Sequence, residues 1–92
     1  MAGTLIATRD RVRRIRAAVA RYCKKRLGDP EAIIEIRPEE EIDKFVVVVA
    51  SSKFKNMPYS QRQDEIWDFL FADSKTSKDD LFEISRIMTE SE

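Results

Sequence analysis

A run of four valines, Val46 to Val49, constrains the fold of this 92-residue chain more than any other feature. An unbroken run of β-branched residues favours a strand that is covered on both faces, as in the middle of a sheet. A polar stretch, Ser51 to Pro58, comes next, followed by a segment with apolar residues at helical spacing. Phe45 to Leu70 is therefore predicted to form a strand, an exit turn and a helix that folds back over the strand.

A long helix is predicted upstream of this unit, from about Arg9 to Leu27. Thr8 is suited to cap its first turn, and Gly28 with Pro30 is suited to end it. Apolar residues recur every three or four positions along one helix face: Val12, Ile15, Val19, Tyr22, and then Arg26 or Leu27. We interpret residues 1–8 as a flexible N-terminus, 9–88 as one domain and 89–92 as a C-terminal tail.

Two further segments read as strands. Residues 31–37 alternate weakly and are followed by Pro38, which we expect to end the first strand; the valine strand runs from about Asp43 to Ala50. Residues 81–88 fit a helix or a strand. We favour the strand, because a terminal helix would leave the valine run at the edge of a two-stranded ribbon.

The predicted fold class is therefore α+β, a small single domain of order α-β-β-α-β. A three-stranded mixed sheet would be covered by two helices. The helix after Pro58 would be the crossover that lets the last strand lie parallel to the valine strand. Its Trp67 is expected to belong to the core, at least in part.

Composition excludes several classes of function. The chain has no histidine and one cysteine, Cys23, so Ser-His-Asp and Cys-His catalysis and an internal disulfide are all excluded. No apolar run approaches the roughly 20 residues that span a bilayer. We expect a cytoplasmic, non-enzymatic protein without cofactor or metal, in which Cys23 is a buried structural thiol.

Charge is distributed asymmetrically although the net charge is zero. Residues 1–30 hold nine Lys/Arg and two Asp/Glu, and the rest holds eight Lys/Arg and fifteen Asp/Glu. The basic face of the first helix has three interpretations: a solvated face that pairs with the acidic remainder, a phosphate-binding surface, or a membrane-surface helix. Lys53 and Lys55, in the exit turn, are either solvated or in contact with phosphate.

The central stretch resembles the BolA-like family, whose fold is a variant of the type II KH arrangement. The resemblance depends on Lys44 to Val49, on Phe54 and Met57 followed by Gln61-Arg62, on Ile66 and Leu70 in helical phase, and on a closing segment, Leu81 to Ser85. It implies a small non-enzymatic regulator, of a kind associated with DNA binding and transcription regulation or with glutaredoxin partners that share a two-iron two-sulfur cluster.

The chain departs from that family where the chemistry lies. Gln63 occupies the position of a histidine after the Gln-Arg pair, and Phe82 lies near the position of the histidine that ligates the shared cluster. Glu39 to Ile42 supply only carboxylates, which are poor ligands for such a cluster. Cluster sharing with a glutaredoxin is therefore doubtful. A conventional KH domain would need a GXXG loop, and none is present.

The leading hypothesis is a BolA-like regulatory module that binds DNA or RNA through the first helix and the exit turn. The predicted nucleic-acid-binding residues are Arg9, Arg13, Arg16, Lys24, Lys53, Lys55 and Arg62. The alternative is a protein–protein adaptor that docks a partner or self-associates, with no nucleic-acid or iron–sulfur role. In either case we expect a monomer or weak homodimer that does not bind membranes.

Overall fold

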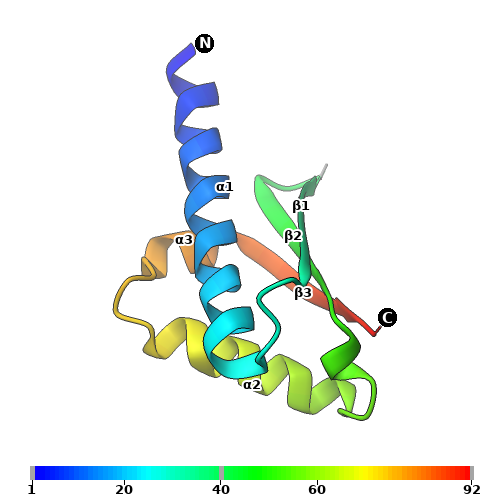
Figure 1. The fold of residues 1–92 in the computed structure, drawn as a ribbon. Helices are drawn as coiled ribbons and strands as arrows, with labels where there is room; N and C mark the ends of the chain where they lie inside the picture. Colours follow the sequence, from blue (N-terminus) through cyan, green and yellow to red (C-terminus); the bar gives the residue numbers. More distant parts are fainter. Residues whose placement is uncertain (1, 40, 92) are drawn as a thin grey trace.

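A computed structural model describes residues 2–39 and 41–91, with side chains described from Thr8 onward. The elements in chain order are α1 (Ala2–Tyr22), a π-helical turn η1 (Cys23–Leu27), β1 (Ile33–Glu39), β2 (Lys44–Ala50), a 3₁₀ turn η2 (Ser52–Phe54), α2 (Tyr59–Ala72), α3 (Lys78–Phe82) and β3 (Ile84–Glu90). The predicted α-β-β-α-β order is confirmed, with the short α3 added before the last strand (Figure 1).

The three strands form one sheet in the order β1-β2-β3. The hairpin partner β1 is antiparallel to β2, and β3 is parallel to it. A parallel neighbour needs a crossover, and α2 with α3 supplies it. The predicted central position of the valine strand and the strand interpretation of the C-terminal segment are thus confirmed.

Both ends of α1 differ from the expected helix. It begins at Ala2 rather than Arg9, so Thr8 lies inside the helix and does not cap it. Met1 lies outside the described residues. At the other end the last turn widens into η1, and Gly28 adopts the predicted left-handed conformation at φ 77°. The N–H groups of Gly28 and Asp29 both donate to the Cys23 carbonyl, which ends the helix.

Pro38 does not end β1, contrary to our expectation. The strand starts at Ile33, and Pro38 pairs with Phe45 before the strand ends at Glu39. A proline is tolerated here because β1 is an edge strand, so its outer side needs no backbone N–H donors for a further strand.

A bulge in β3 explains why this segment resembled both a helix and a strand. Phe45 pairs with Ile84, but the next residue, Val46, pairs with Arg86, so Ser85 is the extra residue. Ile84 and Ile87, three positions apart, are consequently both buried. Leu81 and Phe82, the start of the segment predicted to be a strand, belong to α3 instead, and the strand continues to Glu90, within the expected tail 89–92.

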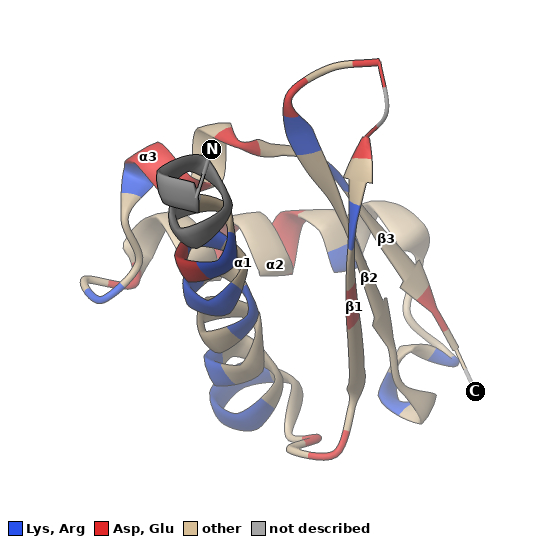
Figure 2. Ribbon diagram, turned by 90° about the horizontal axis from the view of Figure 1, so that it is seen from above, with Lys and Arg blue, Asp and Glu red and all other residues tan. Residues whose placement is uncertain are grey.

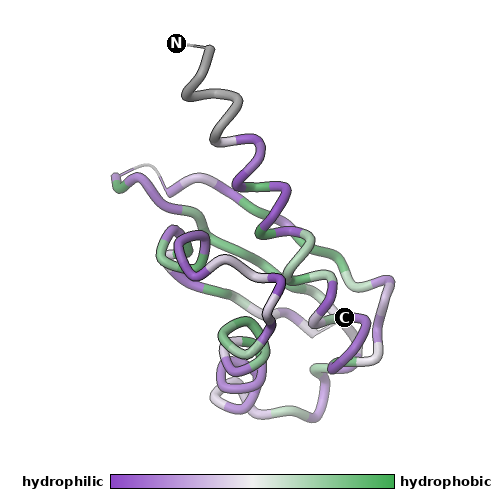
Figure 3. The backbone as a smooth tube through the Cα atoms, turned by 90° about the vertical axis from the view of Figure 1, so that its left-hand side faces the viewer, coloured by the Kyte–Doolittle hydropathy of each residue, from purple (hydrophilic) through white to green (hydrophobic). Residues whose placement is uncertain are grey.

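The core lies between one face of the sheet and the helices. It joins side chains of α1, α2, α3 and the η2 turn to the inner residues of the strands: Ile15, Ala18, Val19, Tyr22, Cys23, Phe45, Val47, Val49, Phe54, Ile66, Leu70, Leu81, Ile84 and Ile87. Trp67 packs against this core, as predicted. Along α1, hydrophilic and hydrophobic stretches alternate as in an amphipathic helix (Figure 3).

In the part of the chain that the structure describes, no helix lies over the other face of the sheet. Val46 and Val48 point away from the core cluster, yet each is only 5% exposed. Longer side chains of β1 and β3 beside them, such as Arg37 and Met88, shield them instead. Our expectation of a strand covered on both faces is therefore correct about burial, but helices cover one face only.

Two valines of β2 test this asymmetry. Val47→Ala removes methyl groups from the closed core and is expected to lower the free energy of unfolding by about 2–3 kcal/mol. Val46→Ala should cost roughly 1 kcal/mol or less, because flexible neighbours can collapse into the space. Urea unfolding of both variants measures the difference, and equal losses would show that the second face is as tightly packed as the first.

Candidate nucleic-acid interface

The arginines of the first helical region divide into two groups. Figure 2 shows Lys and Arg along much of α1, with acidic segments nearby in α2 and α3. One group forms ion pairs with carboxylates in α2 and α3 or directly after them: Arg11, Arg14, Arg21 and Arg26. For these four residues the interpretation as a face that pairs with the acidic remainder of the chain is confirmed.

Asp80 is the centre of the first set of pairs. This α3 carboxylate is 4% exposed and accepts two hydrogen bonds from Arg14, from Nε at 2.8 Å and from Nη2 at 2.9 Å. The hydrogen bonds with Asp80, and then its charge, raise the pKa of Arg14. Arg11 lies farther away, with its Nε 3.9 Å from Asp80 and its Nη1 3.8 Å from Glu83. A buried carboxylate needs such partners, because an unpaired charge there would be costly.

Asp73, directly after α2, is the centre of the second set of contacts with α1. It accepts hydrogen bonds from the Thr76 hydroxyl at 2.7 Å, from Arg21 Nε at 2.8 Å and from the Lys75 N–H at 3.3 Å. These hydrogen bonds, that of Thr76 first, lower the pKa of Asp73 to about 2 against the opposing effect of desolvation. Arg21 and Arg14 therefore fasten α1 to the segment between α2 and β3.

The second group of basic residues forms a stripe on another face of α1 and the η1 turn that continues it. This basic stripe consists of Arg9, Arg13 and Arg16 in α1 and Lys24 in η1, the four residues of the first helical region that we predict to bind nucleic acid. Spacings of four, three and eight residues place them on one side of a helix. All four are exposed, and the Arg13 side chain, 79% exposed, has only Asp10 at 3.9 Å. None of the four forms an ion pair with α2 or α3 within the part of the chain that the structure describes.

A shallow hollow of about 440 Å³ lies along the N-terminal part of this stripe. It is lined by Thr8, Arg9, Val12, Arg13 and Arg16. Arg16 also donates to the Ile34 carbonyl of β1 at 2.6 Å, which fixes its position relative to the sheet. The hollow therefore combines guanidinium groups with one apolar wall, a surface suited to anionic groups.

Arg62 makes hydrogen bonds within the fold that the sequence did not indicate. Its guanidinium donates to the carbonyls of Met57 and Phe54 at 2.8 and 2.7 Å and to the Thr89 hydroxyl at 3.3 Å. It also lies 5.3 Å from the centroid of the Phe54 ring. Arg62 thereby joins the exit turn to β3, and we no longer include it among the nucleic-acid-binding residues.

Lys53 and Lys55 are exposed in and after η2, as a phosphate contact requires. Ser51 shapes this turn, since its hydroxyl accepts from the Lys53 N–H at 3.1 Å and donates to Asp29 at 2.6 Å. The turn between β2 and α2 lies apart from the basic stripe of α1 in both Figure 1 and Figure 2. The seven predicted residues therefore do not form one continuous surface.

The side chains of Cys23 and Tyr22 are buried. Cys23 is a buried free thiol whose pKa burial raises to about 11, and burial raises the pKa of Tyr22 to about 12. The expected structural thiol is confirmed. Among the described residues, no group of three or more Cys, Asp or Glu side chains has an arrangement that would hold a metal ion. Within the same residues, no helix is long and apolar enough to cross a membrane.

Gln63 and Phe82 are the two positions at which the chain departs from the BolA-like pattern. Gln63 donates its side-chain amide to the Ile87 carbonyl of β3 at 2.7 Å. Phe82 lies at the end of α3 and is exposed. Comparisons with models of protein families, with curated proteins and with solved structures found no match to this chain.

Removal of the Arg62 guanidinium should destabilise the fold rather than weaken ligand binding. Arg62→Ala removes the hydrogen bonds to Met57, Phe54 and Thr89, although the Phe54 carbonyl keeps that of the Met57 N–H, and we expect a loss of about 2 kcal/mol in the free energy of unfolding. The double variant Lys53→Ala/Lys55→Ala, in the same turn, is the control and should change stability by less than about 0.5 kcal/mol. Similar losses in both would contradict the structural role of Arg62.

Asp73 should make stability depend on pH in a defined window. Its folded pKa of about 2 lies below the ordinary value of 3.8, so it stabilises the fold above about pH 4 and loses this effect between about pH 4 and 2. Asp73→Asn should therefore cost roughly 1–2 kcal/mol at neutral pH and progressively less below pH 4. Urea unfolding from pH 2 to 7 measures this.

Asp68→Asn provides the matched control for this measurement, because Asp68 is exposed on α2 and forms no ion pair with the described residues. If the difference in the free energy of unfolding between wild type and Asp73→Asn stayed constant from pH 2 to 7, the ionised carboxylate would not be stabilised by its contacts.

Proposed function

We propose that this chain is a non-enzymatic, BolA-like regulatory module that binds the phosphate backbone of DNA or RNA through Arg9, Arg13, Arg16 and Lys24. The observation that carries the proposal is the division of the basic residues. The acidic residues of α2, α3 and the turns after them pair with Arg11, Arg14, Arg21 and Arg26, whereas among the described residues the stripe has only the long Arg13–Asp10 ion pair on its own helix. A stripe that only balanced the acidic part of the chain would be expected to contact it.

The dimensions of the stripe suit several consecutive phosphates. At 1.5 Å per residue, Arg9 and Lys24 are about 22 Å apart along the helix axis. Arg13 and Arg16 lie between them. Four cations in a row can follow one strand of a nucleic acid, whose phosphates are the chief source of affinity without sequence preference.

The opposite face of α1 limits what this interface can recognise. Ile15, Val19 and Tyr22 are buried against the sheet and α2, so the helix offers only one side to a ligand. A helix that reads bases inserts side chains into the major groove, and arginines on a single row supply phosphate contacts first. We therefore propose backbone binding with little dependence on base sequence.

The non-enzymatic part of the proposal is supported by the side chains available for chemistry. The chain lacks histidine, and its one thiol is buried with a raised pKa. Such a thiol is a poor nucleophile. The adaptor alternative is supported by a different part of the molecule, the uncovered face of the sheet.

Fluorescence anisotropy with a labelled 20-base-pair duplex and a matching single strand tests the proposal. The logarithm of the binding constant should fall with the logarithm of salt concentration with a slope of about −3 to −4, as expected for three or four phosphate contacts. Arg9→Gln/Arg13→Gln should weaken binding at 50 mM salt by about tenfold or more and make the slope shallower by about 2.

Lys75→Gln/Lys78→Gln is the matched control, because it removes the same charge from exposed residues away from the stripe. A third pair, Lys53→Gln/Lys55→Gln, measures the separate contribution of the exit turn. Equal weakening by the stripe and control variants would reduce the interface to a general effect of net charge, and no binding at 50 mM salt would refute the function.

A further inference from the structure

The uncovered face of the sheet carries an ordered pattern of charge and apolar residues. Strand register aligns the outward side chains in rows across β1, β2 and β3. One row is Arg37, Val46 and Arg86, the next is Glu35, Val48 and Met88, and the third is Ile33, Ala50 and Glu90. Val46, Val48 and Ala50 thus form an apolar strip between two charged borders.

An apolar strip on this face is unusual for a sheet with helices on one side only. Sheets of this kind typically place polar residues on the solvated face. Here the strip is shielded by the borders, while Ile33 and Met88 remain exposed beside it. Val46 and Val48 lie outside the helical core and are shielded by the border side chains, so Ile33 and Met88 are the apolar groups on this face that a second surface would contact.

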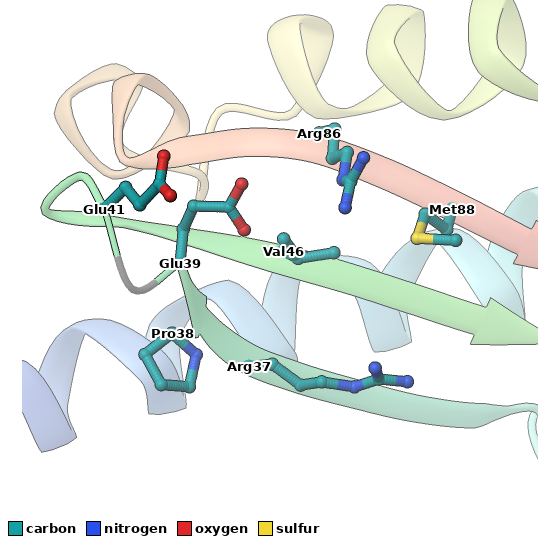
Figure 4. A pocket seen from close by; sticks show the side chains of 7 residues that line it. All are labelled: Arg37, Pro38, Glu39, Glu41, Val46, Arg86 and Met88. Atoms are coloured by element: carbon teal, nitrogen blue, oxygen red, sulfur yellow. The ribbon is translucent and has the colours of Figure 1, made fainter.

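A hollow of about 480 Å³ lies at one end of the strip. Figure 4 shows its lining, with Arg86 directed over Val46 and the carboxylates of Glu39 and Glu41 at the hairpin end. Arg37 pairs with Glu35 on its own strand. Arg86 forms no ion pair within the described part of the chain. The hollow therefore offers a place for an additional carboxylate between Arg37 and Arg86.

We propose that this face binds a second copy of the chain, sheet against sheet, about a two-fold axis that crosses β2 at right angles between Val46 and Val48. The axis places each β2 antiparallel to the other, with Val46 of one copy opposite Val48 of the second. Packed sheets keep such an alignment within about 30° at a separation of about 10 Å. Each chain then uses the same patch, as closed two-fold symmetry requires.

Charge complementarity selects this axis. It exchanges the row of Arg37 and Arg86 with the row of Glu35. Glu35 of the second copy then faces Arg37, and the reverse pair forms by symmetry, while Arg86 lies opposite Met88 of the second copy. The same operation brings Glu90 near the row of Lys44 of the second copy. A two-fold axis parallel to the strands would instead set Arg37 opposite Arg86 of the second copy, which is repulsive.

The size of the face sets the strength of the pairing. Three strands about 4.8 Å apart and rows about 7 Å apart give roughly 300 Å² of contact per copy. Stable complexes bury about 800 Å² per partner. The dimer should accordingly be weak and reversible, with a dissociation constant on the order of 10⁻⁴ M.

Sedimentation equilibrium from about 20 µM to 1 mM, at 50 mM salt and without nucleic acid, tests the pairing. The average mass of the wild-type chain should rise with concentration toward that of a dimer. Glu35→Arg should weaken association at least tenfold, because Arg37 of the second copy would then face another arginine. Arg37→Glu/Arg86→Glu should do the same. Glu31→Arg, an exposed carboxylate before β1, is the control and should not change association.

Mixing the two charge variants gives the sharpest outcome. In a homodimer of either variant, the residues at positions 35 and 37 would face each other with like charge. In a mixed pair these facing charges are opposite, so heterodimers should form. Circular dichroism confirms that each variant is folded. A wild-type chain that stays monomeric at 1 mM, a dimer unaffected by Glu35→Arg, or variants that do not pair on mixing would each overturn the proposal. Because no nucleic acid is present, the result is independent of the function proposed above.

Discussion

The packing of β2 between two strands and under two helices is the constraint on which the rest of the molecule depends. Phe45, Val47 and Val49 face the core, and pairs on both sides saturate the strand's backbone. With β3 parallel to β2, the chain must cross the sheet, and α2 makes that crossing while it covers the core. The free edges then belong to β1 and β3. A side chain donates a hydrogen bond to one backbone carbonyl of each edge strand: Arg16 to Ile34 of β1, and Gln63 to Ile87 of β3. These bonds reduce the capacity of the two edges to pair with strands of other chains.

The same topology sorts the charges of α1. Crossing the sheet brings the segment between α2 and β3 beside the helix, where Asp73 and Asp80 pair with Arg21 and Arg14. Burial decides which arginines these carboxylates hold. Asp80 is almost fully enclosed and needs two partners, whereas exposed charges at the opposite side gain little from pairing. Among the described residues, the basic stripe forms no ion pair with α2 or α3, although the chain has no surplus of positive charge.

Local signals predicted much of this fold. Gly28 ends the first helical region in the left-handed conformation, and the valine run lies centrally, because both features depend on short-range backbone preference and burial. What the sequence could not give depends on distant contacts. Pro38 is accepted only because β1 is an edge, and the Ser85 bulge that places Ile84 and Ile87 on one side depends on register with β2.

The site was predictable only in part for the same reason. Helical spacing places Arg9, Arg13, Arg16 and Lys24 on one face, so periodicity alone groups them. Arg62 looked like a surface cation, but carbonyls from the exit turn, formed by a different segment, surround its guanidinium. The uncovered face was missed because four consecutive valines do not distinguish cover by a helix from cover by neighbouring long side chains.

The two proposed surfaces lie on opposite sides of the sheet, and this gives them a common consequence. The basic stripe belongs to α1, on the helical side, whereas Val46 and Val48 belong to the uncovered side (Figure 4). Pairing through the sheet would leave each stripe accessible and place the two stripes on the outer faces of a four-layer α/β/β/α assembly. Two weak phosphate-binding surfaces on one particle gain affinity through effective concentration when one nucleic acid reaches both. A nucleic acid that spans both would in turn bring two chains together, so a dimer too weak to persist alone would form where it binds.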